Sequence, residues 1–137
     1  MTAALPVRQG LLDTSVFIAV EQHRDLDHGA LPLEQYVSVI TRGELYAGVH
    51  AAQASDVRAV RLSTLDSIAG LVTLQVDGDA AAHWGRLRQA VSAAGRQANV
   101  NDLWIAAIAL THDLPVITQD DDFDLIHELG GPAVIKV

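Results

Sequence analysis

Short apolar segments with the character of β-strands alternate with longer segments of helical periodicity along the whole of this sequence. The strand-like segments are residues 7–13, 36–40, 71–76, 116–118 and 133–137. Between them, apolar residues recur at helical spacing, as with Trp84, Leu87 and Val91. Because parallel strands need long crossover connections, this alternation predicts an α/β fold with a parallel sheet between helical layers.

Length and composition restrict the chain to one ordinary domain. Its 137 residues can bury a real core but are too few for two typical domains, so we expect a single domain over 1–137. No apolar stretch approaches the roughly 20 residues that cross a bilayer, and no signal-peptide pattern is evident. We therefore expect a cytoplasmic protein without membrane contact. The sequence has no cysteine, which excludes disulfides, thiol catalysis and thiolate-bound zinc.

Four acidic residues stand where an apolar segment gives way to a polar one. They are Asp13, Glu44, Asp102 and Asp120. Since the carboxyl ends of strands and the amino ends of helices share one edge of a parallel sheet, these carboxylates could converge. Converging carboxylates repel one another unless some are protonated or a divalent cation neutralises them. The sequence therefore predicts a Mg²⁺ or Mn²⁺ site, which would suit hydrolysis of a phosphate ester.

Each acid taken alone also has a structural explanation. Glu44 follows Thr41 at the spacing of a capping box, which predicts a helix from about Thr41 to Ala52. Asp102 would stabilise the amino end of a helix that Asn101 caps. Asp13 could cap the first helix, and Asp120 could be a turn or cap residue. Both nevertheless directly follow strands expected to be central, where an unpaired buried charge is costly.

The net charge of −8 argues against a nucleic-acid partner, because lysine and arginine drive phosphate binding. This objection weakens if the acids hold cations, since the local field then changes sign. Four arginines are candidates for phosphate contacts, although a solvated helix face is the favoured explanation for any one of them: Arg42, Arg86, Arg88 and Arg96.

Four segments together resemble the PIN-domain ribonucleases, and among them the VapC toxins of bacterial type II toxin–antitoxin pairs. The segments are LLDTSVFIAV at 11–20, VSVITRGELYAGV at 37–49, NDLWIAAIALTHDLPVITQDDDF at 101–123 and VIKV at 134–137. They occur in the family's order and span essentially the whole chain. The resemblance implies a PIN-like three-layer α/β/α sandwich whose central, mainly parallel sheet has about four or five strands.

The resemblance also assigns roles to positions of this sequence. The family's metal-binding acids match Asp13, Glu44, Asp102 and Asp120, and Asp122 matches a further acid that could be an extra ligand. The implied mechanism uses Glu44 as a ligand or as the group that orients the attacking water. Supporting polar side chains, which would fix the carboxylate rotamers, match Thr14, Ser15, Asn101 and Thr118.

The function implied by the resemblance is Mg²⁺- or Mn²⁺-dependent endonucleolytic cleavage of RNA by a metal-activated water, with inhibition of translation and growth. The implied partners are a neutralising VapB-type antitoxin, the RNA substrate and a second copy of the chain in a homodimer. Apolar grooves between the early helices are the expected seat of the antitoxin.

Other classes of protein also gather acids at the edge of a parallel sheet. A signalling receiver domain needs a lysine near its pocket, and Lys136, the only lysine, lies inside the last expected strand. A haloacid-dehalogenase phosphatase needs an aspartate two residues after its nucleophile, where this chain has Ser15. A third alternative is a non-catalytic domain whose acidic edge binds a basic protein.

Overall fold

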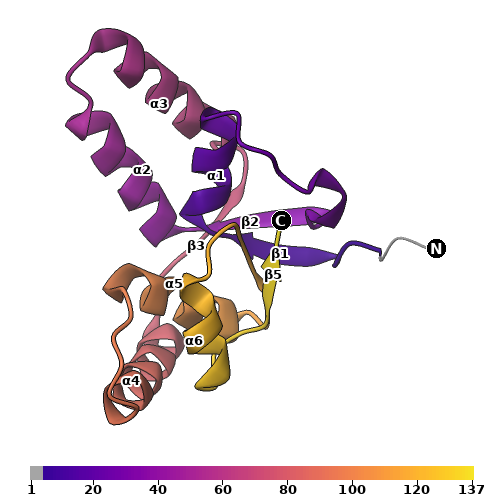
Figure 1. Cartoon of the computed structure of the whole chain (residues 1–137), viewed down its shortest axis with the longest axis vertical. Coiled ribbons are helices and arrows are strands. Elements are labelled where there is room, and N and C mark those ends of the chain that lie inside the picture. The colour runs from indigo at the N-terminus through magenta and orange to yellow at the C-terminus, as the bar shows by residue number, and fades with distance from the viewer. Residues whose placement is uncertain (1–4) are drawn as a thin grey trace.

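Five parallel strands form one sheet with the order β3-β2-β1-β4-β5 (Figure 1). This computed structural model describes residues 5–137. The strands are β1 (Gln9–Leu12), β2 (Glu34–Ser38), β3 (Val72–Leu74), β4 (Val116–Thr118) and β5 (Val134–Lys136). β1 occupies the centre, paired with β2 on one side and with β4 on the other. The predicted parallel sheet is confirmed.

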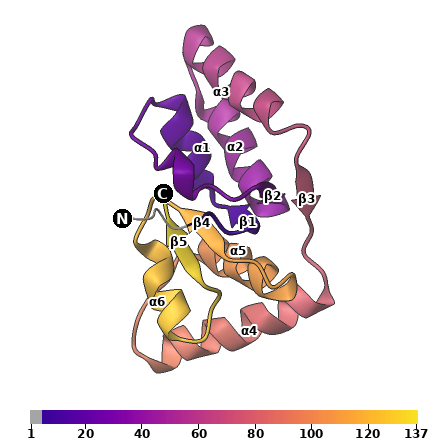
Figure 2. The same cartoon turned by 90° about the vertical axis from the view of Figure 1, so that its right-hand side faces the viewer.

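Helices cover both faces of this sheet (Figure 2). The helices are α1 (Thr14–Glu21), α2 (Val39–Ala51), α3 (Ser55–Ser67), α4 (Gly78–Ala93), α5 (Val100–Thr111) and α6 (Asp122–Glu128), with a short 3-10 helix η1 (His28–Ala30). One layer contains α1, α2 and α3, and the other contains α4, α5 and α6. Within residues 5–137, no helix is both long enough and apolar enough to span a bilayer.

Neighbouring residues of the central strands supply two separate cores. Leu11 and Val116 pack with α4, α5 and α6, whereas Leu12 and Ile117 pack with α1, α2 and α3. Successive side chains of a strand point to opposite faces, so a strand covered on both sides must be apolar throughout. The continuous apolar runs that mark β1 and β4 in the sequence are therefore the signature of the three-layer sandwich.

Two helices begin at residues other than those predicted. The N-cap of α2 is Ser38 and not Thr41, because Ser38 Oγ accepts a 3.0 Å hydrogen bond from the N–H of Thr41. The N-cap of α5 is Asn99 and not Asn101, whose own N–H donates to Asn99 Oδ1 at 2.8 Å. In both helices the predicted cap lies inside the first turn. The capping box at Thr41 was thus wrong, and Glu44 is available for another role.

Candidate metal centre

Asp13 lies at the end of the central strand, with only 4% of its surface exposed. Its N–H donates to the carbonyl of Ile117 at 2.9 Å, which continues the pairing of β1 with β4. Ser15 Oγ and Thr118 Oγ1 each donate to Asp13 Oδ2 at 2.7 Å. Burial raises the pKa of Asp13, and these hydroxyl donors partly oppose that rise. The carboxylate is therefore held in one orientation by two segments that are remote in sequence.

Glu44 projects from α2 toward the start of α1. Thr14 Oγ1 donates to Glu44 Oε1 at 2.7 Å and lies 3.0 Å from Thr41 Oγ1. Thr41 is fully buried and is itself fixed by the Ser38 cap. Because Thr14 directly follows Asp13, this chain of contacts attaches Glu44 to the carboxyl edge of β1.

Asp102 lies in the first turn of α5, where Asn99 Oδ1 also accepts from its N–H at 3.3 Å. Its pKa is raised to about 7, first by burial and then by the negative charges of four other carboxylates. Those carboxylates belong to Asp13, Asp122, Glu44 and Asp120. The structure thus brings together all five acids that the sequence singled out.

Asp120 and Asp122 come from the loop that joins β4 to α6. The N–H of Asp120 donates to Thr118 Oγ1 at 3.0 Å, so the hydroxyl that orients Asp13 also holds this loop. Burial raises the pKa of Asp120, as do the charges of Asp13 and Asp122, whereas the charge of Arg24 lowers it. Asp122 is the first residue of α6 and is exposed to solvent.

Lys136 forms ion pairs with acidic residues beside this loop. Its ammonium group bonds to Asp121 and, at 2.8 Å, to Asp124. The only lysine of the chain therefore forms ion pairs with two acids that are not among the five predicted site residues. A receiver domain would need it at the central carboxylate, where instead Ser15 and Thr118 bind Asp13.

Gln119 is a supporting residue that the sequence did not single out. Its N–H donates to Ser15 Oγ at 3.0 Å, and its side-chain amide donates to the carbonyls of Asp25 at 2.7 Å and Val137 at 3.1 Å. Its position between Thr118 and Asp120 was the only signal in the sequence. Asn101 is exposed in the first turn of α5, and its predicted supporting role stays a prediction.

The carboxylates suit a hydrated divalent cation better than a fully enclosed one. Within residues 5–137, no three acidic or histidine side chains are placed so that together they could hold a metal ion as they stand. The acids are nevertheless close enough that the charges of the other four raise the pKa of Asp102. Mg²⁺ commonly binds through one or two carboxylates and keeps several waters, so this more open donor set fits it. A cation there would relieve the repulsion that raises the pKa of Asp102.

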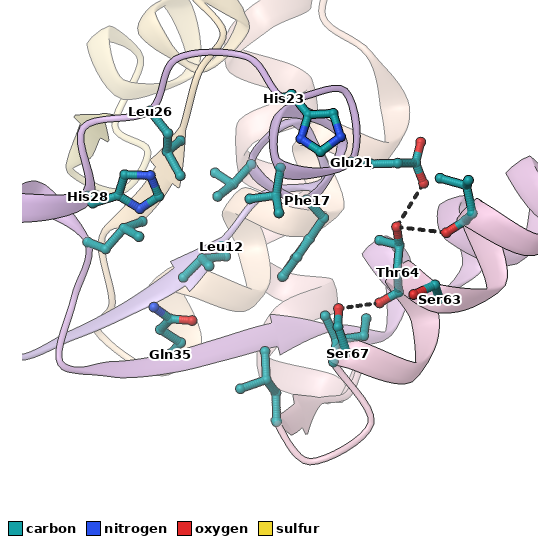
Figure 3. A pocket seen from close by; sticks show the side chains of 16 residues that line it. Leu12, Phe17, Glu21, His23, Leu26, His28, Gln35, Ser63, Thr64 and Ser67 are labelled. Carbon is teal, nitrogen blue, oxygen red and sulfur yellow. Dashed lines mark hydrogen bonds between the residues drawn. The ribbon is translucent and has the colours of Figure 1, made fainter.

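A separate apolar groove lies among α1, η1, β2 and α3 (Figure 3). Its volume is about 490 Å³, and Phe17, Leu26 and Val60 are among the residues that line it. At one side, Thr64 Oγ1 donates to Glu21 Oε1 at 2.8 Å. Two apolar side chains of this groove are largely exposed, Val20 at 57% and Val60 at 50%. An exposed apolar surface of this kind commonly marks a site of protein interaction.

Comparison with known proteins gives consistent matches over most of the chain. The family model described as the PIN domain matches residues 10–129. Ribonuclease VapC5 of Mycobacterium tuberculosis is 50% identical over 128 residues, which cover 93% of this chain and 95% of that protein. Ribonuclease VapC4 of the same organism is 41% identical over 118 residues, or 85% of this chain and 90% of that protein.

A solved structure agrees in both sequence and fold. The crystal structure of VapBC-5 from M. tuberculosis, a member of the VapBC family of toxin–antitoxin systems, superimposes with a TM-score of 0.83 at 48% identity. The match covers 94% of this chain and 97% of that one.

Proposed function

Because this chain belongs to the PIN-domain family and is a VapC-type ribonuclease toxin, we propose that it cleaves RNA in a Mg²⁺- or Mn²⁺-dependent hydrolysis at the acidic edge of its sheet. The observation that carries the proposal is the environment of Asp102, whose pKa is raised to about 7 by burial and by four other carboxylates. A domain that only docks a basic protein does not require several carboxylates around a partly buried acid. A site for a divalent cation requires such a cluster, because the cation is bound by carboxylate oxygens.

In this proposal Asp13, Asp102 and Asp120 hold the cation, with Asp122 as a further ligand. A bound divalent ion would lower the pKa of a coordinated water and stabilise charge on the phosphate. Asp13 keeps the orientation that Ser15 and Thr118 impose on it. The amino end of α5 lies at the same edge and favours negative charge through its dipole.

Glu44 is proposed to orient the attacking water or to serve as a ligand itself. The hydrogen bond from Thr14 to Oε1 fixes its carboxylate beside the end of β1. The supporting hydroxyls of Thr14, Ser15 and Thr118 hold these acids in fixed rotamers, which limits the rearrangement needed when substrate arrives.

A VapB-type antitoxin is the proposed protein partner. The similar crystal structure is of a toxin–antitoxin system, VapBC-5, and this chain has an apolar groove of suitable size among α1, η1, β2 and α3. We propose that an apolar segment of the antitoxin occupies it, with Val20 and Val60 as contacts. Helix α1 joins this groove to the acidic edge, since Thr14 begins the helix and Val20 lies near its end. A homodimer stays a prediction from the family resemblance.

The proposal is tested by cleavage and melting measurements on the same purified protein. RNA cleavage should require added Mg²⁺ or Mn²⁺ and stop in excess chelator. Added Mg²⁺ should also raise the melting temperature, because a ligand that binds only the folded state stabilises it. Asp102→Asn should abolish both effects.

Asp113→Asn is the matched control for that variant. Asp113 is an exposed aspartate beyond the other end of α5, with a φ of 53° that asparagine tolerates. It should keep parental cleavage and the parental response to Mg²⁺. Undiminished cleavage by Asp102→Asn, or cleavage by the parent in excess chelator, would contradict the proposal. A protein without either cleavage or a Mg²⁺ response would instead fit the non-catalytic binding domain.

A further inference from the structure

This acidic chain has few cationic residues, and most of them form hydrogen bonds to other residues of the protein. The sequence has nine lysines and arginines against seventeen acids. Six of the nine donate side-chain hydrogen bonds to other residues: Arg8, Arg42, Arg58, Arg61, Arg86 and Lys136. Arg42, a candidate for phosphate contact from the sequence, instead bonds to Thr73 and to the carbonyl of Ile68. Within residues 5–137, only Arg24, Arg88 and Arg96 keep a guanidinium group with no hydrogen bond to the protein.

Of these three arginines, Arg24 is the one beside the acidic edge, because the side chain of Gln119, the residue before Asp120, donates to the carbonyl of Asp25 at 2.7 Å. The charge of Arg24 also lowers the pKa of Asp120, against the rise caused by burial and by neighbouring carboxylates. The three ion pairs found within residues 5–137 do not include Arg24. Arg24 is exposed to solvent, so its guanidinium group is accessible to a ligand. Arg88 lies on α4 and Arg96 in the turn that follows it.

The backbone around Arg24 is fixed on both sides. Helix α1 ends in a Schellman turn: the N–H of Arg24 donates to the carbonyl of Ala19 at 2.9 Å, and that of His23 donates to Val20 at 3.2 Å. His23 takes the left-handed position of this turn, with a φ of 55°. On the other side, the Gln119 amide holds the carbonyl of Asp25 at 2.7 Å. Because Gln119 stands between Thr118 and Asp120, it attaches the turn to the loop that carries the acids.

We propose that Arg24 binds a backbone phosphate of the RNA strand at the rim of the metal centre, and thereby positions the strand for cleavage. A guanidinium group can donate two parallel hydrogen bonds to phosphate oxygens, which suits it to this task better than a lysine. A protein with a net charge of −8 gains little general attraction for RNA, so a single free cation beside the site carries much of the contact. Contacts of this kind position a nucleic acid without reading its sequence.

This inference rests on the proposed ribonuclease function, and salt-dependent binding tests it. The probe is a short fluorescent single-stranded RNA of mixed sequence, bound in the presence of Ca²⁺ in place of Mg²⁺ and titrated at several salt concentrations. Loss of one phosphate contact reduces the slope of log K against log salt by about 0.7 for single strands. Arg24→Gln should show that reduction, and Arg24→Lys, which keeps the charge, should not.

Steady-state cleavage of the same RNA with Mg²⁺ provides the second readout. Arg24→Gln should raise KM about tenfold with kcat nearly unchanged, because the contact is made in the ground state and the transition state alike. The matched control is Arg88→Gln, another exposed arginine without a hydrogen bond to the protein. It should leave the salt slope, KM and kcat at parental values. Both variants should have the melting temperature of the parent.

The outcomes separate this inference from the function on which it rests. If the parent does not cleave RNA in any metal, the proposed function fails. If the parent cleaves, and Arg24→Gln keeps the parental salt slope and KM, then Arg24 has no role in binding the strand and the inference is overturned. Equal effects of Arg24→Gln and Arg88→Gln would also overturn it, because they would indicate general charge attraction without a defined contact.

Discussion

Oγ1 of Thr118 lies 2.7 Å from Oδ2 of Asp13, although 105 residues separate the two in sequence. Thr118 ends β4 and Asp13 follows β1, and these two strands are neighbours at the centre of the sheet. Both side chains are buried. The orientation of the central carboxylate is therefore set by a hydroxyl of the adjacent strand, and strand pairing and site geometry depend on each other.

Thr118→Val should weaken both cleavage and stability. The substitution keeps the shape of the side chain but removes the donor to buried Asp13, which should lower kcat by about 10- to 100-fold and the free energy of unfolding by about 1–3 kcal/mol. Cleavage assays and chemical denaturation measure the two effects. Thr111→Val is the control, because the Thr111 hydroxyl bonds only to the carbonyl of Ala107, at 2.9 Å, within α5. Parental cleavage by Thr118→Val would show that this hydroxyl does not orient Asp13 for catalysis.

The stability of the metal-free protein should fall as the pH rises toward neutrality. The pKa of Asp102 is raised in the folded state from the ordinary 3.8 to about 7, so between these values the folded state holds a proton that the unfolded state releases. The stabilisation from this proton is fully present below pH 3.8 and is lost as the pH rises through about 7. We expect the parent to lose roughly 1 kcal/mol more than Asp102→Asn between about pH 5 and about pH 8, since solvent screens this half-buried group.

Denaturation in the presence of a chelator, at both pH values, measures that difference. Asp102→Asn lacks the titrating carboxylate, so its free energy of unfolding should depend less steeply on pH. Identical pH dependence in the two proteins would mean that Asp102 is not the group that stores this proton.

The convergence of the acids could be predicted because sequence position alone determines it in a parallel sheet. Asp13 follows an apolar strand, Asp120 comes two residues after another, and Asp102 opens an apolar helix, and all three kinds of position share one edge of the sheet. The helical layers on both faces of the sheet were equally predictable, because strands alternate with segments of helical periodicity along the sequence.

Helix caps and supporting contacts were less predictable, because they depend on which of several similar residues tertiary packing selects. Ser38 and Thr41 both have hydroxyls suited to an N-cap, and the pairing of β2 up to Ser38 decides between them. Asn99 and Asn101 presented the same ambiguity at α5. Gln119 could not be foreseen, since its partners Asp25 and Val137 come from distant segments whose placement no local pattern encodes.

Val60→Glu should abolish binding of the antitoxin without affecting RNA cleavage. The side chain lines the groove among α1, η1, β2 and α3 and is 50% exposed, so a charge there is tolerated by the free protein but not beneath an apolar partner segment. Calorimetric titration with the cognate antitoxin measures the loss. Leu33→Glu is the control, because Leu33 is 75% exposed and does not line the groove. If both variants bind the antitoxin as the parent does, the antitoxin uses another surface.

Gly131→Ala should destabilise the fold. A Cβ at this position would lie 2.5 Å from the backbone carbonyl oxygen of Ile126, an atom that cannot move without disturbing α6. We expect a loss of about 1–3 kcal/mol in the free energy of unfolding, measured by chemical denaturation. Gly85→Ala provides the contrast, because nothing lies within 4 Å of its added Cβ inside helix α4. That variant should gain about 0.5–1 kcal/mol, and a loss there would contradict the packing described for α4.

The central position of β1 has a consequence for the cell that makes this protein. A ribosome delivers β1 before the other strands, but β4, which pairs with its second edge, emerges only after β2 and β3. Until then Asp13 lacks the hydroxyl of Thr118, and one side of β1 has no hydrogen-bonding neighbour. A nascent chain interrupted before β4 carries Asp13, Glu44 and Asp102 without the framework that aligns them. We therefore expect prematurely terminated products to be harmless to their host.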